Sequence, residues 1–291
     1  MTTKSVAACL SPFLLAAALY VRAEQDAPAT TQFEIFKALA EQGQAAAQYN
    51  VALSYSEGRG TPTNVTEAVR WYGASALQGH APAQRTLGLL YYTGKGVAKD
   101  VRKSFELFLL AAMQGDETAE YMLALSYEHG FGTGENLREA VSWYRNAAGK
   151  GHKLAQYNLA SCYFEGKGVQ KDLAQSVQWY RKSAEQGYPG AQYNLALAYE
   201  RGDGIPKDEH EAVKWYRMAA EQGDFEAQNN LGLCYVLGSG VAQDYVQAHK
   251  WFSLAAAKGL TSAKNNLART EKRMTRRQLS EAQQIEKGLK P

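Results

Sequence analysis

Cysteine is scarce in this chain, which has three among 291 residues. Cys9 lies in an N-terminal segment that we expect to be removed, while Cys162 and Cys234 occupy equivalent positions of a repeating pattern, two units apart. Stacked helices lie roughly 8–10 Å apart, so two units exceed the ~7 Å Cα separation that a disulfide tolerates. The sequence therefore predicts no disulfide framework, and Cys162 and Cys234 are interpreted as small core residues.

Excess charge is also lacking. The formal net charge is +3, and Lys4 and Arg22 contribute two of those positive charges within the first 23 residues, which hold no acid. A nucleic-acid-binding domain usually carries a strong basic patch. The sequence gives no electrostatic reason to expect a nucleic-acid partner.

Motifs of catalysis or metal binding are absent. No Gly-x-Ser-x-Gly elbow occurs, and the paired glycines are not followed by the Lys-Ser/Thr of a phosphate loop. The five histidines form neither an HExxH motif nor a cluster with cysteine, and we interpret them as solvated or structural: His80, His129, His152, His210 and His249. We expect no catalytic site, no metal site and no cofactor.

What the sequence does contain is one pattern repeated at a spacing of 36 residues without insertion or deletion. The six full copies are residues 47–82, 83–118, 119–154, 155–190, 191–226 and 227–262, and a seventh start follows at Ala263. A fixed period of this length is typical of a solenoid, in which each unit contacts only its neighbours. The pattern predicts an all-α fold built of stacked αα-hairpins.

The ends of the chain differ from the repeats. Residues 1–23 combine Lys4, an apolar stretch and a small-residue site ending at Ala23, which predicts a secretory signal peptide; an uncleaved membrane anchor is the alternative. Residues 24–31 are predicted to be a polar linker, and 32–46 an N-terminal capping half-repeat. Residues 263–291 are predicted to form a partial repeat and a C-terminal capping helix that begins after Thr275.

Each repeat is predicted to form two helices separated by a Gly-x-Gly turn. In the first helix apolar residues recur at i, i+4 and i+8, as in Ala191, Leu195 and Tyr199. The first glycine of the turn suits the left-handed residue that ends a helix. One column of N-cap residues starts the second helix, with Glu or Gln three positions later in five copies, a pattern resembling a capping box: Asn64, Asp100, Asn136, Asp172, Asp208 and Asp244.

The second helix carries an aromatic pair, Trp-Tyr in four copies, Trp251-Phe252 in the last and Leu107-Phe108 in the second. An alanine column and a terminal glycine follow, as in Ala220 and Gly223. These residues together resemble the Sel1-like repeat, a relative of the tetratricopeptide repeat, over about residues 32–289. Copies 1, 4 and 5 match its pattern nearly throughout.

The resemblance implies a right-handed superhelix whose concave face is lined by the first helix of each pair. It also implies an adaptor or scaffold role in assembling protein complexes, often in the bacterial envelope or in secretion. One cysteine-rich, secreted branch of the family is associated with β-lactam binding and hydrolysis. Its paired cysteines are missing from this chain, so that activity is not carried over.

By alignment with the tetratricopeptide hairpin, we place ten candidate partner-binding residues on the concave face: Tyr49, Arg85, Tyr92, Tyr121, Glu128, Tyr157, Phe164, Tyr193, Glu200 and Asn229. One turn beyond the first tyrosine column lie Leu53, Leu89, Leu125, Ser161, Leu197 and Leu233. Tyrosine offers contact area with a polar tip, which suits a recognition surface. The alternative is that these side chains simply pack against the next repeat. An adjacent asparagine column, which includes Asn158 and Asn194, would either bond a peptide backbone or tie helices together.

The sequence favours an exported, non-catalytic, monomeric scaffold, periplasmic or secreted, that binds a protein or peptide on its concave face. A cell-wall or β-lactam hydrolase related to the cysteine-rich branch is the alternative from the enzyme class. A purely structural envelope spacer is a third reading. The identity of the partner is not encoded in any motif.

Overall fold

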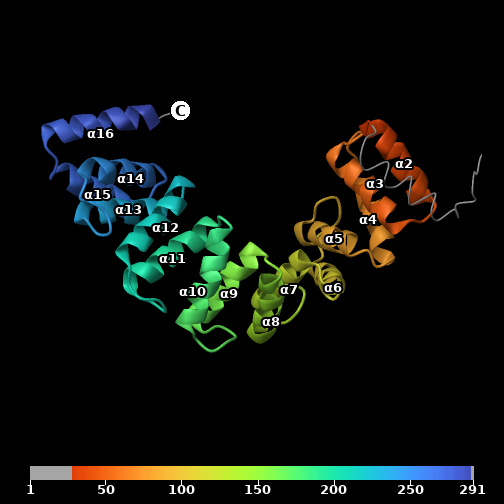
Figure 1. The fold of residues 1–291 in the computed structure, drawn as a ribbon. Helices are drawn as coiled ribbons and strands as arrows, with labels where there is room; N and C mark the ends of the chain where they lie inside the picture. The colour runs from red at the N-terminus through yellow and green to blue at the C-terminus, as the bar shows by residue number, and fades with distance from the viewer. Residues whose placement is uncertain (1–27, 290–291) are drawn as a thin grey trace, which may run out of the picture. The chain divides into compact units, whose positions relative to one another are not determined.

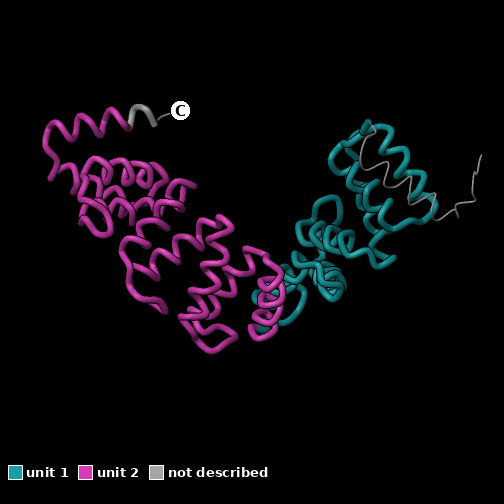
Figure 2. Tube along the Cα trace, viewed as in Figure 1, with its two compact units in different colours: residues 1–136 teal, residues 137–291 magenta. Residues whose placement is uncertain are grey.

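The computed structural model describes the backbone of residues 28–289 and the side chains as far as Ile285. The predicted signal peptide lies outside these residues. Two compact units divide the chain, residues 1–136 and 137–291 (Figure 2). The described part of the first unit contains six helices (Figure 1): α2 Ala29–Glu41, α3 Ala45–Glu57, α4 Val65–Leu77, α5 Ala81–Thr93, α6 Val101–Ala112 and α7 Glu117–His129.

The second unit continues the alternation of first and second helices, and no strand occurs in the described residues. Its helices are α8 Leu137–Gly149, α9 Lys153–Glu165, α10 Leu173–Glu185, α11 Pro189–Arg201, α12 Glu209–Glu221, α13 Phe225–Leu237, α14 Tyr245–Ala257, α15 Thr261–Glu271 and α16 Arg276–Leu289. Each of the two compact units is a stack of αα-hairpins, and helix α16 packs on α14. The predicted all-α solenoid fold is confirmed.

The N-terminal boundary requires one correction. Residues 29–31, assigned to the linker from the sequence, are the first residues of α2. The reason is register, because α2 begins where the second helix of a repeat should begin. The carbonyl of Ala29 packs against Gly60, where an added Cβ would lie 2.1 Å from the carbonyl oxygen.

The predicted N-caps form in each repeat whose cap contacts are described, at Asn64, Asp100, Asp172, Asp208 and Asp244. The reciprocal half of the capping box does not. The backbone N–H of Asp208 donates to the carbonyl of Tyr199 at 2.9 Å, so it is not available to Glu211, whose carboxylate instead accepts from Lys214 at 3.2 Å. A complete box forms at the start of α16, where Thr275 and Gln278 bond in both directions.

The two glycines of each turn have different roles. Gly202 ends α11 in the left-handed region, with φ +79°. Gly204 also has a positive φ, but an added Cβ there would lie 2.3 Å from the carbonyl oxygen of Leu173, the first residue of α10. The second glycine therefore sets how closely one repeat approaches the preceding one.

Buried glutamines join consecutive repeats, a feature that the sequence analysis missed. Gln192 is 1% exposed; its amide donates to the carbonyl of Ala184 at 3.1 Å and its oxygen accepts from Gln222 at 2.8 Å. The same arrangement recurs with Gln156 and Gln186. Because a buried polar group left without partners is costly, this ladder fixes the register between neighbours.

The second aromatic of each pair is buried in every repeat, and its identity follows that of a small residue on the first helix. Tyrosine accompanies alanine, as in Ala196 with Tyr216, whereas phenylalanine accompanies glycine, as in Gly232 with Phe252. An added Cβ at Gly232 would lie 2.6 Å from the Phe252 ring. The phenylalanine rings therefore sit deeper against the first helix, on a surface that only glycine leaves open.

Replacing Gly232 with alanine should lower the free energy of unfolding by about 1–3 kcal/mol, because the methyl group overlaps the buried Phe252 ring. Gly73→Ala is the matched control, since an added Cβ at that helical position has nothing within 4 Å. The control should raise stability by roughly 0.5–1 kcal/mol. Urea unfolding followed by circular dichroism measures both, and equal effects of the two variants would contradict this account of the packing.

Candidate functional site

The predicted binding residues of the first unit all lie on first helices and are partly buried. Tyr49 packs on Tyr72, with ring centroids 5.6 Å apart, and on His80 at 5.2 Å. Arg85 forms an ion pair with Asp116 at 3.3 Å. These contacts give Tyr49 and Arg85 a packing role in addition to whatever surface they present.

The other predicted residues of this unit, Tyr92, Tyr121 and Glu128, are half-buried. The Tyr92 ring lies 5.7 Å from that of Phe131, across the turn that follows α7. The structure thus places all five first-unit candidates on first helices.

In the second unit, the predicted tyrosines stack on the buried tyrosines of second helices. Tyr157 lies 5.7 Å from Tyr180, and Tyr193 lies 6.0 Å from Tyr216. Tyr157 also meets Tyr188 edge-on at 5.0 Å. Part of each tyrosine therefore belongs to the core, as the packing alternative holds.

The other predicted binding residues of the second unit differ in how exposed their side chains are. Asn229 is buried and accepts from Asn266 at 2.9 Å, while Glu200 accepts from the Tyr216 hydroxyl at 2.9 Å. Phe164, by contrast, is 38% exposed. Among the second-unit candidates, Phe164 presents a large apolar ring to the solvent.

Several asparagines of the adjacent column tie helices together, and Asn266, which donates to Asn229, is one of them. The amide of Asn158 donates to the hydroxyl of Tyr144 at 3.1 Å. Asn230 donates to Tyr216 at 3.2 Å. These last two bonds each link a first helix to the second helix before it.

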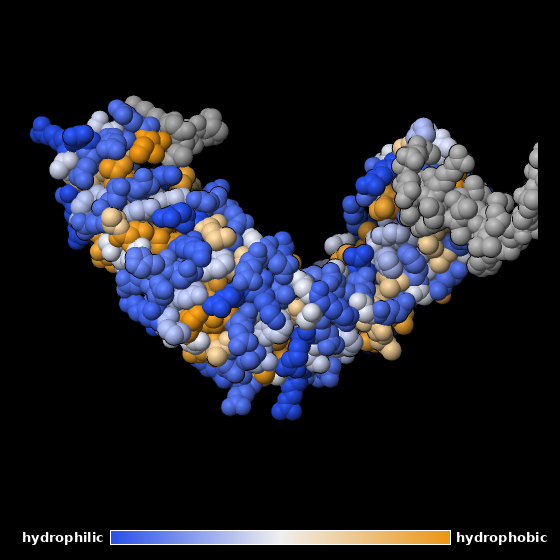
Figure 3. All heavy atoms as spheres, viewed as in Figure 1, coloured by the Kyte–Doolittle hydropathy of each residue, from blue (hydrophilic) through white to orange (hydrophobic). Residues whose placement is uncertain are grey.

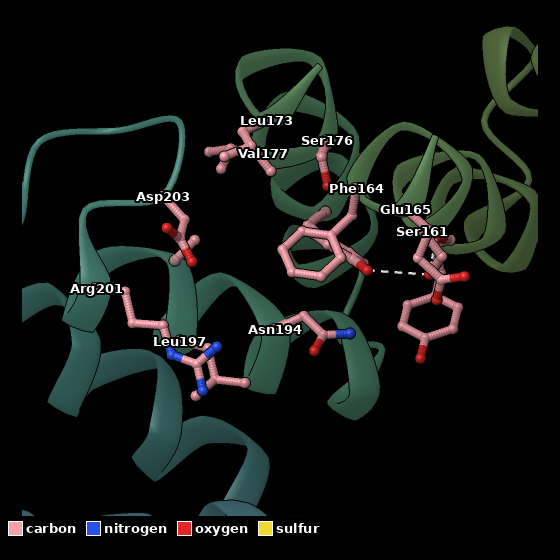
Figure 4. Close-up of a pocket in the computed structure, with 13 residues that line it drawn as sticks. Ser161, Phe164, Glu165, Leu173, Ser176, Val177, Asn194, Leu197, Arg201 and Asp203 are labelled. Atoms are coloured by element: carbon pink, nitrogen blue, oxygen red, sulfur yellow. Dashed lines mark hydrogen bonds between the residues drawn. The ribbon is translucent and has the colours of Figure 1, made fainter. Parts of the chain in front are cut away.

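A pocket of about 270 Å³ opens between α9, α10 and α11. Figure 4 shows Ser161 and Phe164 of α9 and Leu173 and Val177 of α10 on two sides, with residues of α11 on the third: Asn194, Leu197 and Arg201. Tyr157 and Tyr180 complete its wall. The pocket therefore gathers Tyr157 and Phe164, two of the predicted binding residues, in one cavity.

A smaller pocket, of about 160 Å³, lies at the equivalent place two repeats on, between α13, α14 and α15. Its lining includes Leu233 and Val236, which correspond to Ser161 and Phe164, together with Arg269 and Arg273. On the face of the second unit that Figure 3 shows, most of the surface is hydrophilic and apolar residues form separate small patches.

Comparison with known families identifies the repeats. The Sel1 repeat signature matches six consecutive segments of the chain: residues 45–80, 81–116, 118–152, 153–188, 189–224 and 225–260. The chain belongs to the Sel1 repeat family. Sel1 repeat proteins generally mediate protein–protein interactions and are generally non-catalytic.

Two solved structures resemble this Sel1 repeat protein over most of its length. One is c5321, a protective antigen of uropathogenic Escherichia coli strains with an SLR fold; it is 34% identical, with a TM-score of 0.82, and the match covers 93% of this chain and 58% of that one. The other is a Sel1 repeat protein from Oxalobacter formigenes, 32% identical, with a TM-score of 0.71, covering 83% of this chain and 95% of that one. Comparison with curated proteins finds no match.

The histidines of the Sel1 repeats have structural contacts. His152 accepts from the backbone N–H of Ala155 and caps α9, and the buried His249 contacts the Glu271 carboxylate at 3.2 Å.

Within the described residues, no group of three or more His, Cys, Asp or Glu could hold a metal ion. None of the helices described is both long and apolar enough to cross a membrane.

Cys162 and Cys234 are buried, as the sequence predicts. Burial, together with the nearby carboxylates of Glu200 and Glu209, raises the pKa of the Cys234 thiol to about 12. The thiolate is the reactive form of cysteine, so Cys234 is held in its unreactive protonated state.

Burial also raises the pKa of Tyr180 to about 12, although a hydrogen bond with Ser161 acts in the opposite direction. The phenol titrates near 10 when unfolded, so its contribution to stability is complete below pH 10 and is lost as the pH rises towards 12. Each such tyrosine steepens the fall of the unfolding free energy by up to about 1.4 kcal/mol per pH unit.

Tyr180→Phe should therefore show a shallower loss of unfolding free energy between pH 10 and 12, measured by urea unfolding at each pH. A decline identical to that of the wild type would exclude this assignment.

Proposed function

We propose that this Sel1 repeat protein is an exported, non-catalytic, monomeric scaffold that binds a peptide segment of a partner protein along its first helices. The observation that carries the proposal is the pocket between α9, α10 and α11. Two first helices, α9 and α11, supply most of its lining and the second helix α10 most of the rest. The family resemblance places the binding face on first helices, and the pocket exposes Phe164 beside the buried ring of Tyr180.

The chemistry of the pocket suits peptide binding more than turnover. Aromatic and aliphatic side chains make up just over half of its lining, and neither histidine nor cysteine is among the residues that line it beside the two carboxylates, Glu165 and Asp203. Binding hot spots in protein interfaces are typically aromatic or arginine side chains around such pockets. Phe164 and Arg201 match that composition.

Site-specific photo-crosslinking tests the binding face. p-Benzoylphenylalanine in place of Phe164 should yield a discrete covalent adduct with a partner in cells of the native host. The same probe in place of Met218, which is similarly exposed at 39% but lies on the second helix α12, is the control and should yield no such adduct. Mass spectrometry of the adducts reads the result, and equal labelling from both positions would contradict binding along the first helices.

Export rests on the N-terminal sequence, because residues 1–23 lie outside the described part of the chain. Lys4, the apolar stretch and the small residues Val21 and Ala23 are typical of a cleaved signal peptide. Protein recovered from the periplasm or medium should begin at Glu24 by N-terminal sequencing. Recovery of the whole chain in the membrane fraction would favour an uncleaved anchor instead.

A further inference from the structure

The wall of the pocket between α9, α10 and α11 carries, at Ser161, a residue type that the other full repeats lack at that position. Leucine occupies the column of Ser161 in the other five full repeats: Leu53, Leu89, Leu125, Leu197 and Leu233. One turn further, Phe164 stands where the next repeat has Glu200. The fourth repeat therefore has a small polar residue and a large apolar one in the places where the fifth has leucine and glutamate.

The two changes are coupled through a buried tyrosine hydroxyl. In the fifth repeat, the Tyr216 hydroxyl donates to Glu200 at 2.9 Å, beside Leu197. In the fourth repeat, the Tyr180 hydroxyl bonds Ser161 instead, at 3.0 Å. A buried hydroxyl needs a partner. In the fourth repeat the partner stands at the position of Ser161 and not at the position equivalent to Glu200. That equivalent position can therefore hold Phe164.

The change of partner also alters the hydrogen bonding of Asn194, the asparagine next to the pocket. Asn158 and Asn230 donate to the tyrosine hydroxyl of the preceding second helix. In the part of the chain that the structure describes, Asn194 has no such bond to Tyr180, whose hydroxyl is joined to Ser161. An amide that is structural in the neighbouring repeats is thus available at the pocket wall.

The lining indicates what would fill the cavity. Tyr157, Phe164 and Tyr180 present aromatic surfaces, and Leu197 and Val177 present aliphatic ones. Aromatic rings attract one another in offset or edge-on arrangements beyond the gain from burial alone. Arg201, which forms no ion pair within the described residues, stands at the same cavity (Figure 4) and can stack its guanidinium on an incoming ring.

We propose that this pocket receives an aromatic side chain from a peptide segment of the partner, and that the amide of Asn194 bonds the backbone of that segment. The proposal rests on the proposed function, since it names the side chain that the binding face selects. The exchange at Ser161 and Phe164 makes the fourth repeat the specificity-determining one.

Converting the fourth repeat to the arrangement of the fifth tests the proposal. The double variant Ser161→Leu/Phe164→Glu fills the pocket with leucine and supplies Tyr180 with the carboxylate that Tyr216 already has in Glu200. It should fold as the wild type does, which thermal unfolding checks. Val236→Glu, which introduces the same charge at the equivalent position two repeats on, is the matched control.

The probe is a random peptide display library selected on the full-length wild-type protein. Peptides enriched from it should share one aromatic residue, and their affinity should fall roughly ten- to hundredfold for the double variant while Val236→Glu binds them unchanged. Replacing the shared aromatic residue with alanine should cost a similar factor on the wild type and little on the double variant, as expected for two groups in contact.

The contrary outcomes separate the two proposals. Enriched peptides that bind the double variant as tightly as the wild type would overturn the pocket and leave peptide binding intact. Enrichment around an aliphatic anchor would overturn the aromatic assignment. If no peptide is enriched on the folded wild-type protein, the proposed function fails together with the pocket.

Discussion

Each hairpin of this protein depends on its neighbour, because it has apolar surfaces that it cannot bury alone. Three sets of residues set how the helices meet. The second glycine of each turn, such as Gly204, admits the backbone of the preceding repeat, and buried glutamines such as Gln192 bond helices on both sides. The tyrosine or phenylalanine of the second helix packs on the first helix of its own repeat, as Phe252 does on Gly232. The contacts of Gly204 with Leu173 and of Gln192 with Ala184 join adjacent repeats.

The positions that make these contacts tolerate few residue types, whereas neighbouring positions of the repeat can vary. The column of Ser161 is one of the latter, because either leucine or serine is compatible with the stack if the tyrosine hydroxyl finds a partner. The fourth repeat uses that freedom to open a cavity and expose Phe164. Variation at this position changes the surface without disturbing the register, which is how a repeat protein can acquire specificity at a single place.

The sequence predicted the helices and their ends well, since those depend on interactions between residues close in the chain. The N-caps at Asp172 and Asp208 and the left-handed Gly202 form as expected. The reciprocal half of the capping box failed for a non-local reason: the N–H it requires is already bonded to a tyrosine carbonyl in the preceding helix. The binding face was harder. Tyr157 and Phe164 do meet at one pocket, but the sequence did not distinguish them from Asn229, which is buried.

By itself, therefore, the sequence determined the period, the number of repeats, the hairpin in each and the family to which they belong. These properties follow from spacing and from short-range backbone chemistry, which recur in every copy. Only the tertiary structure decided which group receives each buried hydroxyl and why glycine accompanies phenylalanine. It also decided where side chains of α9, α10 and α11 enclose a cavity. The physical reason is that side chains from three different helices converge at each of these points, and a column of residues read along the chain does not show which of them touch.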